Sequence, residues 1–194
     1  MRGGDAVRTF FAVELDAGAR QAAAGVARRL AEAPGGDGVR WVRPEALHVT
    51  LRFLGETPAA RVAPLARRAA QEVAALAPFT LHLGPAELFP SPRRPRVVAL
   101  GLEPAAPLLE LAAALERACV ALGFPAELRP FRAHLTLGRL LGRSFPTVAA
   151  LAAPAAELAV EEVVLFRSEL SPAGSRYTPL ERARLGAPRV HHPI

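Results

Sequence analysis

The sequence predicts an α+β fold in which two lobes face each other across a groove. Predicted strands outnumber predicted helices, and a strand–helix–strand order occurs in each half of the chain. The pattern His-x-Thr-Leu also occurs twice, in EALHVTLRFLGE (45–56) and in FRAHLTLGRLLG (131–142). The copies lie too far apart for a solenoid repeat. We therefore expect one domain over residues 1–194, with two halves of similar build.

Each predicted element rests on a local pattern. Strands are assigned where aromatic and β-branched residues alternate with others, and helices where apolar residues recur every three or four positions. Asp16 is placed to cap the first helix, and Gly123 to end the last one. The elements in order are strand 7–15, helix 17–33, strands 39–42 and 46–54, helix 57–77, strands 79–84 and 96–103, helix 106–122, and strands 131–140, 161–170 and 176–185.

The composition is that of an ordinary globular protein and excludes several classes. Hydrophobic residues make up 51% of the chain and charged residues 22%, so most of the chain is expected to be ordered. No apolar run is long enough for a membrane span, and the first residues, MRGGDAVRTFFAVEL, lack the features of a secretory signal. Cys119 is the single cysteine, which excludes an internal disulfide and predicts a cytoplasmic protein.

The chain carries a net positive charge, and all of its basic residues are of one type. The formal net charge is +6, and all 24 basic residues are arginine. A compositional bias of the genome accounts for the choice of arginine over lysine. An anionic partner is the functional alternative, since guanidinium groups match phosphate oxygens in bidentate geometry. Net charge alone does not decide between these interpretations.

Strand alternation gives each copy of the repeated motif one apolar face and one polar face. In the first copy, His48, Thr50 and Arg52 share a face, because residues two apart point the same way. In the second, His134 and Thr136 share a face with Arg132, Gly138 lying further along it. One such strand alone is an ordinary surface strand. A matched second copy in the other half favours a site in the groove between the lobes.

Two imidazoles and two hydroxyls suit phosphodiester chemistry. One neutral imidazole accepts a proton from water while a second, protonated one donates to a leaving oxygen. Hydroxyls of Thr50 and Thr136 are placed to hold phosphoryl oxygens. A zinc site is disfavoured because neither motif carries a third ligand on its histidine face. A cysteine nucleophile is disfavoured because Cys119 lies on the apolar face of a helix. We therefore expect no metal at this site.

The chain resembles the two-histidine phosphoesterase superfamily, and within it the RNA 2′,3′-cyclic phosphodiesterases, also called 2′-5′ RNA ligases. The matching segments are RTFFAVEL, WVRPEALHVTLRFLGE, RPFRAHLTLGR and VVLFRSELSPAGSRYTPL, spread over nearly the whole chain. The resemblance implies a bilobal fold with two antiparallel sheets around a central cleft, helices outside, and a pseudo-twofold relation between the halves. It also implies hydrolysis of a terminal 2′,3′-cyclic phosphate on RNA to a 2′-phosphate, without metal or nucleotide cofactor.

The resemblance also implies roles for particular residues. His48 is expected to donate a proton to the leaving 3′ oxygen and His134 to accept one from water. The positions five residues after each histidine, Phe53 and Arg139, are expected to bind substrate, by stacking on a base and gripping phosphate. Strand alternation puts both of these on the face opposite the histidines.

By alternation, Arg52 and Arg132 are the substrate-binding candidates instead. The sequence leaves both pairs open.

Three functions remain in play. The first is the cyclic phosphodiesterase, acting on RNA ends or cyclic nucleotides, with no membrane and no obligate protein partner, as a monomer. The second is 2′-5′ RNA ligation, the reverse of the same chemistry. The third is a non-catalytic RNA-binding module, which has no need of paired histidines.

Overall fold

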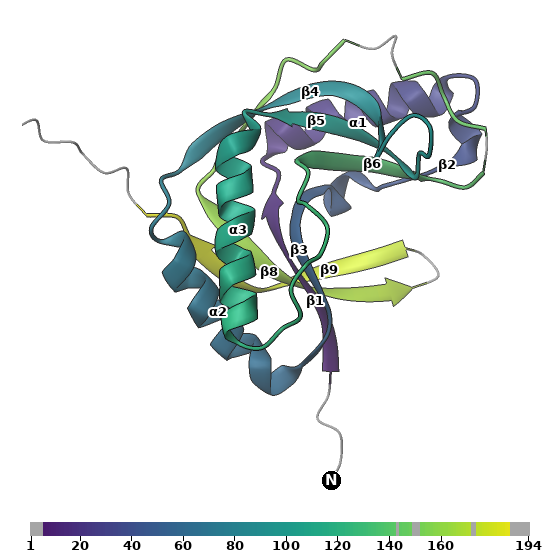
Figure 1. Ribbon diagram of the computed structural model, residues 1–194. Coiled ribbons are helices and arrows are strands. Elements are labelled where there is room, and N and C mark those ends of the chain that lie inside the picture. Colours follow the sequence, from purple (N-terminus) through teal and green to yellow (C-terminus); the bar gives the residue numbers. More distant parts are fainter. Residues whose placement is uncertain (1–5, 143, 149–151, 172–173, 187–194) are drawn as a thin grey trace, which may run out of the picture.

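Two antiparallel sheets form the body of the protein (Figure 1). The computed structural model describes residues 6–142, 144–148, 152–171 and 174–186. Sheet A has the strand order β3-β1-β8-β9 and sheet B the order β2-β6-β5-β4-β7. The strands are β1 (Ala6–Glu14), β2 (Val39–Trp41), β3 (His48–Pro58), β4 (Phe79–Phe89), β5 (Val97–Glu103), β6 (His134–Leu140), β7 (Glu157–Val160), β8 (Glu162–Ser171) and β9 (Gly174–Arg184).

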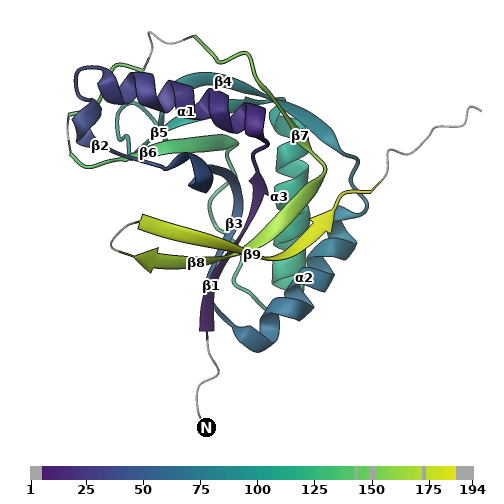
Figure 2. The same cartoon turned by 180° about the vertical axis from the view of Figure 1, so that it is seen from behind.

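In the described part of the chain, three helices cover the backs of the sheets. α1 (Ala17–Glu32) packs on strands of sheet B, whereas α2 (Ala59–Val73) and α3 (Ala105–Ala121) pack together behind sheet A (Figures 1 and 2). Two short 3₁₀ turns, η1 (Gly36–Gly38) and η2 (Pro44–Ala46), flank β2. No helix within these described ranges is long and apolar enough to cross a membrane.

The chain crosses between the lobes, so the lobes are not its two halves. β1 pairs with β3 and β5 pairs with β6, each pair separated in sequence by one of the longer helices. The helix of the first pair, α1, packs on sheet B, and the helix of the second, α3, packs against β3 of sheet A. Sheet A also takes β8 and β9 from the C-terminal half, and sheet B takes β2 from the N-terminal half. The bilobal α+β prediction is confirmed, but each lobe mixes both halves.

The main core lies behind both sheets and leaves their other faces to the cleft. One continuous apolar cluster joins the helices to the back faces, with Phe11 and Val13 from sheet A and Leu100 and Leu135 from sheet B. A second, smaller cluster sits on the front face of sheet A. Its buried members are Phe10, Ala12, Val164 and Phe166, with Tyr177 packed against them. The front of sheet A is therefore lined with aromatic rings.

Most predicted elements are confirmed, and the differences have local causes. Asp16 caps α1, its carboxylate accepting from the Ala19 amide at 2.8 Å, and Gly123 ends α3 with φ of +73°. The helix expected from residue 57 begins at Ala59, because Thr57 belongs to β3 and its hydroxyl lies 2.8 Å from that of Thr9 on β1. β7 lies outside the predicted elements, since four residues are too few to show a pattern.

Candidate active site

Both motif strands carry a β-bulge at the same place. In β3, Thr50 lies opposite Ala12 and Arg52 opposite Phe11, so Leu51 has no partner on β1. In β6, Thr136 lies opposite Ala99 and Gly138 opposite Val98, so Leu137 has no partner on β5. A bulge places two residues opposite one and shifts the alternation of side chains beyond it. Each bulged leucine is the third residue after its motif histidine.

The bulge brings Phe53 onto the histidine face. Phe53 lies opposite Phe10, and Thr50 lies opposite Ala12. Because Phe10 and Ala12 are two residues apart on β1, their partners share one face of the sheet. The ring of Phe10 lies 5.4 Å from that of Phe53 and 4.9 Å from that of His48. The prediction from simple alternation, which put Phe53 on the opposite face, is wrong.

The same reasoning places Arg139 on the histidine face of sheet B. Thr136 lies opposite Ala99 and Arg139 opposite Val97, and those partners are two residues apart on β5. Arg139 is exposed. The expectation that Arg139 points away from the histidines is therefore also wrong, for the same physical reason.

His48 is held at the start of β3 by its backbone and by rings. Its Nδ1 lies 2.8 Å from the carbonyl oxygen of Ala46. Because a carbonyl only accepts, Nδ1 carries the hydrogen and Nε2 is left for a ligand. Phe10 packs at 4.9 Å, the edge of Tyr177 at 4.9 Å, and Phe166 at 6.5 Å between ring centroids.

His134 is held in a matching way by a different neighbour. Its Nδ1 lies 2.8 Å from the carbonyl oxygen of Arg132, two residues earlier, as Ala46 is two residues before His48. The imidazole stacks on Phe89, with ring centroids 3.9 Å apart and planes 16° apart. In both histidines, Nε2 is thus left to contact a ligand.

Burial lowers the pKa of both histidines, and the neighbouring charges differ. For His48, burial is the largest cause, the backbone hydrogen bond opposes it, and the charge of Arg139 lowers the pKa further. For His134, burial again lowers the pKa most. The backbone hydrogen bond and the carboxylate of Glu87 raise it, and Arg132 lowers it. β3 and β6, which carry the two histidines, also contact each other, so the two half-sites lie close together. The two imidazoles are therefore mostly neutral at pH 7 before substrate binds.

The motif threonines are half-buried beside the histidines. Thr50 precedes the bulge of β3 and Thr136 that of β6, each on the same face as its histidine. Within the described ranges, neither hydroxyl has a hydrogen-bond partner in the protein. Both are therefore available to donate to a bound anion.

Arg52 lies on the helix side of β3, away from the histidines. Its Nε donates to Glu116 of α3 at 2.5 Å, and its Nη2 to the carbonyl of Pro125 at 2.5 Å. Only 10% of its side chain is exposed. The expectation that Arg52 shares a face with His48 is wrong, because the bulge at Leu51 turns it toward α3. In this structure Arg52 ties the segment leading to the second motif onto β3.

Arg132 stays near His134 but is engaged with a neighbouring segment. Its guanidinium carbon lies 4.5 Å from the centre of the Phe89 ring, and its Nη1 donates to the carbonyl of Pro90 at 2.6 Å. Phe89 therefore contacts both His134 and Arg132. Arg132 borders the site and supports the ring on which the histidine rests.

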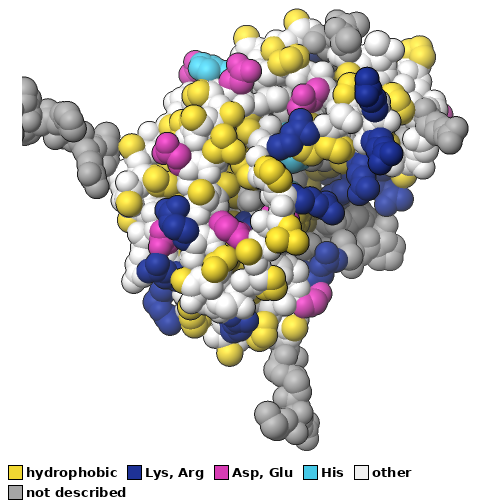
Figure 3. Space-filling model, in the orientation of Figure 1, with side chains coloured by type: hydrophobic (Ala, Val, Ile, Leu, Met, Phe, Trp, Pro, Cys, Tyr) yellow, Lys and Arg dark blue, Asp and Glu magenta, His cyan; other side chains and the backbone are white. Residues whose placement is uncertain are grey.

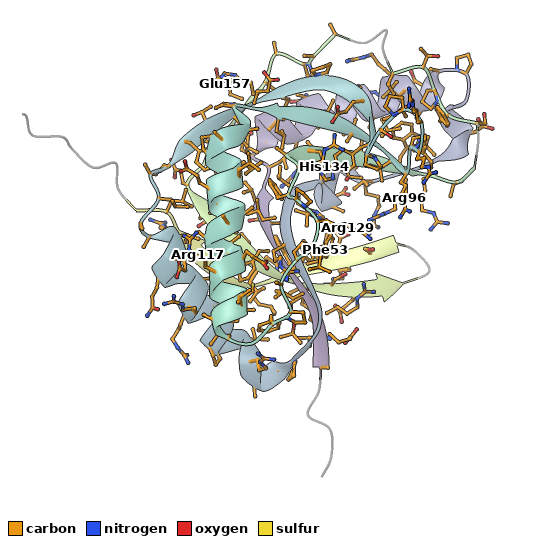
Figure 4. The ribbon with its side chains drawn as sticks, viewed as in Figure 1. Phe53, Arg96, Arg117, Arg129, His134 and Glu157 are labelled. Atoms are coloured by element: carbon orange, nitrogen blue, oxygen red, sulfur yellow. The ribbon has the colours of Figure 1, made fainter. Side chains whose placement is uncertain are left out.

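Three further residues border the site and escaped sequence reasoning, Phe10, Phe89 and Glu87, and Tyr177 packs against His48 beside them. They come from β1, β9 and β4, which carry no repeated motif. Phe10 alternates with Ala12 in the first strand, so its face could be inferred from sequence, but only the sheet order brings it to His48. Figure 4 shows His134 on the sheet B side and Phe53 on the sheet A side of the opening.

The remaining expectations concern metal and thiol chemistry. Among the residues that the structure describes, no three His, Cys, Asp or Glu side chains gather as a metal site. Cys119 is fully buried in α3, and burial raises the pKa of its thiol to about 11. A thiolate nucleophile at this position is excluded.

Comparison with known proteins decides the family. The family model described as LigT-like phosphoesterase matches residues 13–99 and again 100–177, so each match contains one motif. The chain belongs to the LigT-like phosphoesterase family. The RNA 2′,3′-cyclic phosphodiesterase of Methanothermobacter thermautotrophicus is 36% identical over 92% of this chain and 99% of its own.

Solved structures of LigT-like phosphoesterases share the fold. The crystal structure of the Thermus thermophilus protein TT0787 superposes with a TM-score of 0.81 at 32% identity, over 93% of this chain and 98% of that one. E. coli LigT complexed with 3′-AMP gives a TM-score of 0.74 at 30% identity, over 94% of this chain and 99% of that one. The resemblance noted from the sequence is confirmed.

Proposed function

We propose that this protein hydrolyses the terminal 2′,3′-cyclic phosphodiester of RNA to a 2′-phosphomonoester, with two histidines and no metal ion. The observation that carries the proposal is the matched pair of imidazoles, each with Nδ1 bound to the carbonyl two residues earlier at 2.8 Å. Two identically oriented Nε2 atoms on facing sheets suit proton transfer on opposite sides of one phosphate. The relatives named as RNA 2′,3′-cyclic phosphodiesterases support the same reaction.

The chemistry divides between the two histidines. Nε2 of neutral His134 takes a proton from water as the water oxygen bonds to phosphorus. Nε2–H of protonated His48 gives its proton to the 3′ oxygen as the P–O3′ bond breaks, and the P–O2′ bond remains. A proton then passes from His134 to solvent and another returns to His48, which restores the starting state.

Binding of the substrate is expected to favour the protonated form of His48. Both histidines have a lowered pKa in the free protein, so His48 starts mostly neutral at pH 7. The negative charge of a bound phosphodiester favours the imidazolium and raises the pKa of the adjacent histidine. Thr50 and Thr136 hydroxyls then donate to the non-bridging oxygens, where charge accumulates in the transition state.

Phe53 and Arg139 are proposed to hold the rest of the terminal nucleotide. The ring of Phe53 is 55% exposed, which is unusual for phenylalanine and suits stacking on a base. Arg139 is exposed on the histidine face of sheet B, and its charge lowers the pKa of His48, which supports a role for it in binding the phosphate. Arg132 supports Phe89 and through it His134.

We further propose that the protein acts as a monomer in the cytoplasm on RNA ends bearing a cyclic phosphate, or on cyclic nucleotides. Both histidines and both threonines come from one chain, so the site needs no second copy. The lone, buried thiol suits a reducing compartment.

Product analysis in the presence of EDTA tests the proposal. Purified protein is incubated with RNA carrying a 2′,3′-cyclic phosphate. The products are separated chromatographically and compared with authentic 2′-phosphate and 3′-phosphate standards. The 2′-phosphate alone is expected. A 3′-phosphate product, or loss of activity with EDTA, contradicts the proposed chemistry.

A supplied 5′-hydroxyl RNA serves as the ligation arm of the same experiment, because microscopic reversibility allows one site to join ends as well as to open them. Joined product exceeding hydrolysis would make ligation the leading function. Binding of the RNA without turnover would favour a non-catalytic module.

A further inference from the structure

A group of exposed arginines continues the active site along one end of sheet B. We call Arg40, Arg43 and Arg96 the arginine rim. Arg40 lies directly opposite Arg139 on the neighbouring strand, so their side chains share a face. Val39 and Trp41, on either side of Arg40, pack into the core behind the sheet, which confirms that Arg40 faces the cleft.

Arg96 and Arg43 extend this group on both sides. The Arg96 carbonyl accepts from the amide of Leu140, next to Arg139, and its amide donates to Phe89 at 2.8 Å. Figure 4 shows Arg96 at the end of sheet B that overhangs the β8–β9 hairpin. Arg43 follows β2, and its Nη2 lies 3.4 Å from the carbonyl of Ser175 in β9. Arg40 and Arg139 thus lie on the neighbouring strands β2 and β6, and Arg96 directly precedes β5, the next strand of the sheet.

The arginines of the rim form no ion pair with a described carboxylate. Within the described ranges, no carboxylate lies within 4 Å of Arg40, Arg43, Arg96 or Arg139. Arg52, Arg117 and Arg182, which lie on sheet A or its helices, are instead paired with glutamates. In Figure 3, basic side chains gather around the hollow on this face, with few acidic ones among them. Unpaired cations beside a phosphate site attract further phosphates.

We propose that the arginine rim binds the phosphates of the nucleotides that precede the terminal one, so that an oligonucleotide is a better substrate than a cyclic mononucleotide. The inference rests on the proposed function. A cyclic phosphate ends its strand, and every other phosphate therefore belongs to the 5′ side. With the terminal phosphate at Arg139, the neighbouring strands of the sheet lie about 5 Å to either side. The next phosphates then meet Arg40 or Arg96, and the track ends at Arg43.

The test compares two substrates with the same terminal nucleotide, a 2′,3′-cyclic mononucleotide and an oligonucleotide of about six nucleotides ending in the cyclic phosphate. The double variant Arg40→Gln/Arg96→Gln is compared with wild type at about 50 and about 200 mM salt. The matched control is Arg28→Gln/Arg29→Gln, which removes two exposed arginines of α1, on the far face of sheet B.

Wild type is expected to prefer the oligonucleotide by about tenfold or more in kcat/KM at low salt. The double variant is expected to lose most of that preference while keeping its rate on the mononucleotide. For the oligonucleotide, the slope of log(kcat/KM) against log[salt] should become less steep by about 1.4, or about 0.7 for each lost phosphate contact. The control should behave as wild type. A wild type without length preference, or a double variant that keeps it, overturns the inference. Failure to hydrolyse either substrate overturns the proposed function instead.

Discussion

The half-site around His48 is walled by aromatic rings, whereas the half-site around His134 combines one ring with charges of both signs. Phe10, Phe166 and Tyr177 surround His48. Among the residues that the structure describes, His134 stacks on one ring, that of Phe89, and Glu87 and Arg132 act on its pKa. What the half-sites share is backbone: a histidine that begins a strand, a carbonyl two residues earlier that orients it, and a bulge three residues later.

The comparison separates geometry from chemistry. The shared backbone features point both imidazoles, both threonines and the residue five positions on into one cleft. The side chains that differ set the environment of each transferred proton and the part of the substrate that each sheet contacts. The aromatic wall suits a base and the arginine-bearing wall suits phosphate. Substitutions in each half-site can separate these two contributions, and their expected effects run from several orders of magnitude in rate to a fraction of a pH unit.

Removing either imidazole is expected to have the largest effect. His48→Ala and His134→Ala should each lower kcat on a cyclic-phosphate RNA by about a hundredfold to ten-thousandfold, the contribution of one general acid or base. Thermal unfolding monitored by circular dichroism serves as the control for an intact fold. Near wild-type turnover in either variant would contradict a role for both half-sites.

Replacing Arg52 is expected to reduce stability rather than binding. Arg52→Met removes charge-assisted hydrogen bonds to Glu116 and to the carbonyl of Pro125. We expect the free energy of unfolding in urea to fall by about 2 kcal/mol, with KM close to wild type. Arg139→Met should show the reverse pattern, a raised KM with little loss of stability. A raised KM at unchanged stability in Arg52→Met would restore Arg52 as a substrate ligand.

Removing the exposed ring of Phe53 is expected to weaken binding moderately. Phe53→Ala should raise KM by about tenfold, since stacking of a base on an aromatic side chain contributes about 1–3 kcal/mol. Leu109→Ala is the matched control, because Leu109 is another exposed apolar side chain, on α3. If both variants raised KM equally, stacking at Phe53 would not be the cause.

The neighbouring charges are expected to shift the pH optimum by a fraction of a pH unit. The active form needs one protonated and one neutral histidine, so the optimum of kcat/KM lies midway between their pKa values in the free protein. Both pKa values lie below 6.5, and the optimum should too. Arg139→Gln removes a charge that lowers the pKa of His48 and should move the optimum upward. Glu87→Gln removes a charge that raises the pKa of His134 and should move it downward. Shifts in the same direction would contradict this difference between the half-sites.

Much of the site was predictable because it lies in a repeat. His48, Thr50, His134 and Thr136 follow from the two motifs, and the α+β class follows from the strand and helix patterns. The bulges were not predictable, because a bulge is a property of two paired strands and leucine suits the core with or without one. Alternation therefore misplaced Phe53, Arg139 and Arg52. Phe53 and Arg139, for which the family resemblance implied a substrate role, do lie on the histidine face, and that role stays a prediction.

The exchange of strands and helices between lobes also could not be inferred from local patterns. β8 and β9 follow the second motif in sequence, yet they complete the sheet of the first. Tyr177 consequently reaches His48 rather than His134. Sheet order depends on long-range pairing, which local propensity does not encode.

The division of acid and base roles is the central claim, and a change of leaving group tests it most directly. In a 2′,3′-cyclic substrate with sulfur in place of the bridging 3′ oxygen, a thiolate departs without needing a proton, whereas an alkoxide needs one. His48→Ala should recover most of its lost rate on the sulfur substrate, because only its proton donor is missing. His134→Ala should stay slow, because water is still not activated. Equal recovery in both variants, or recovery in His134→Ala alone, would contradict the assigned roles.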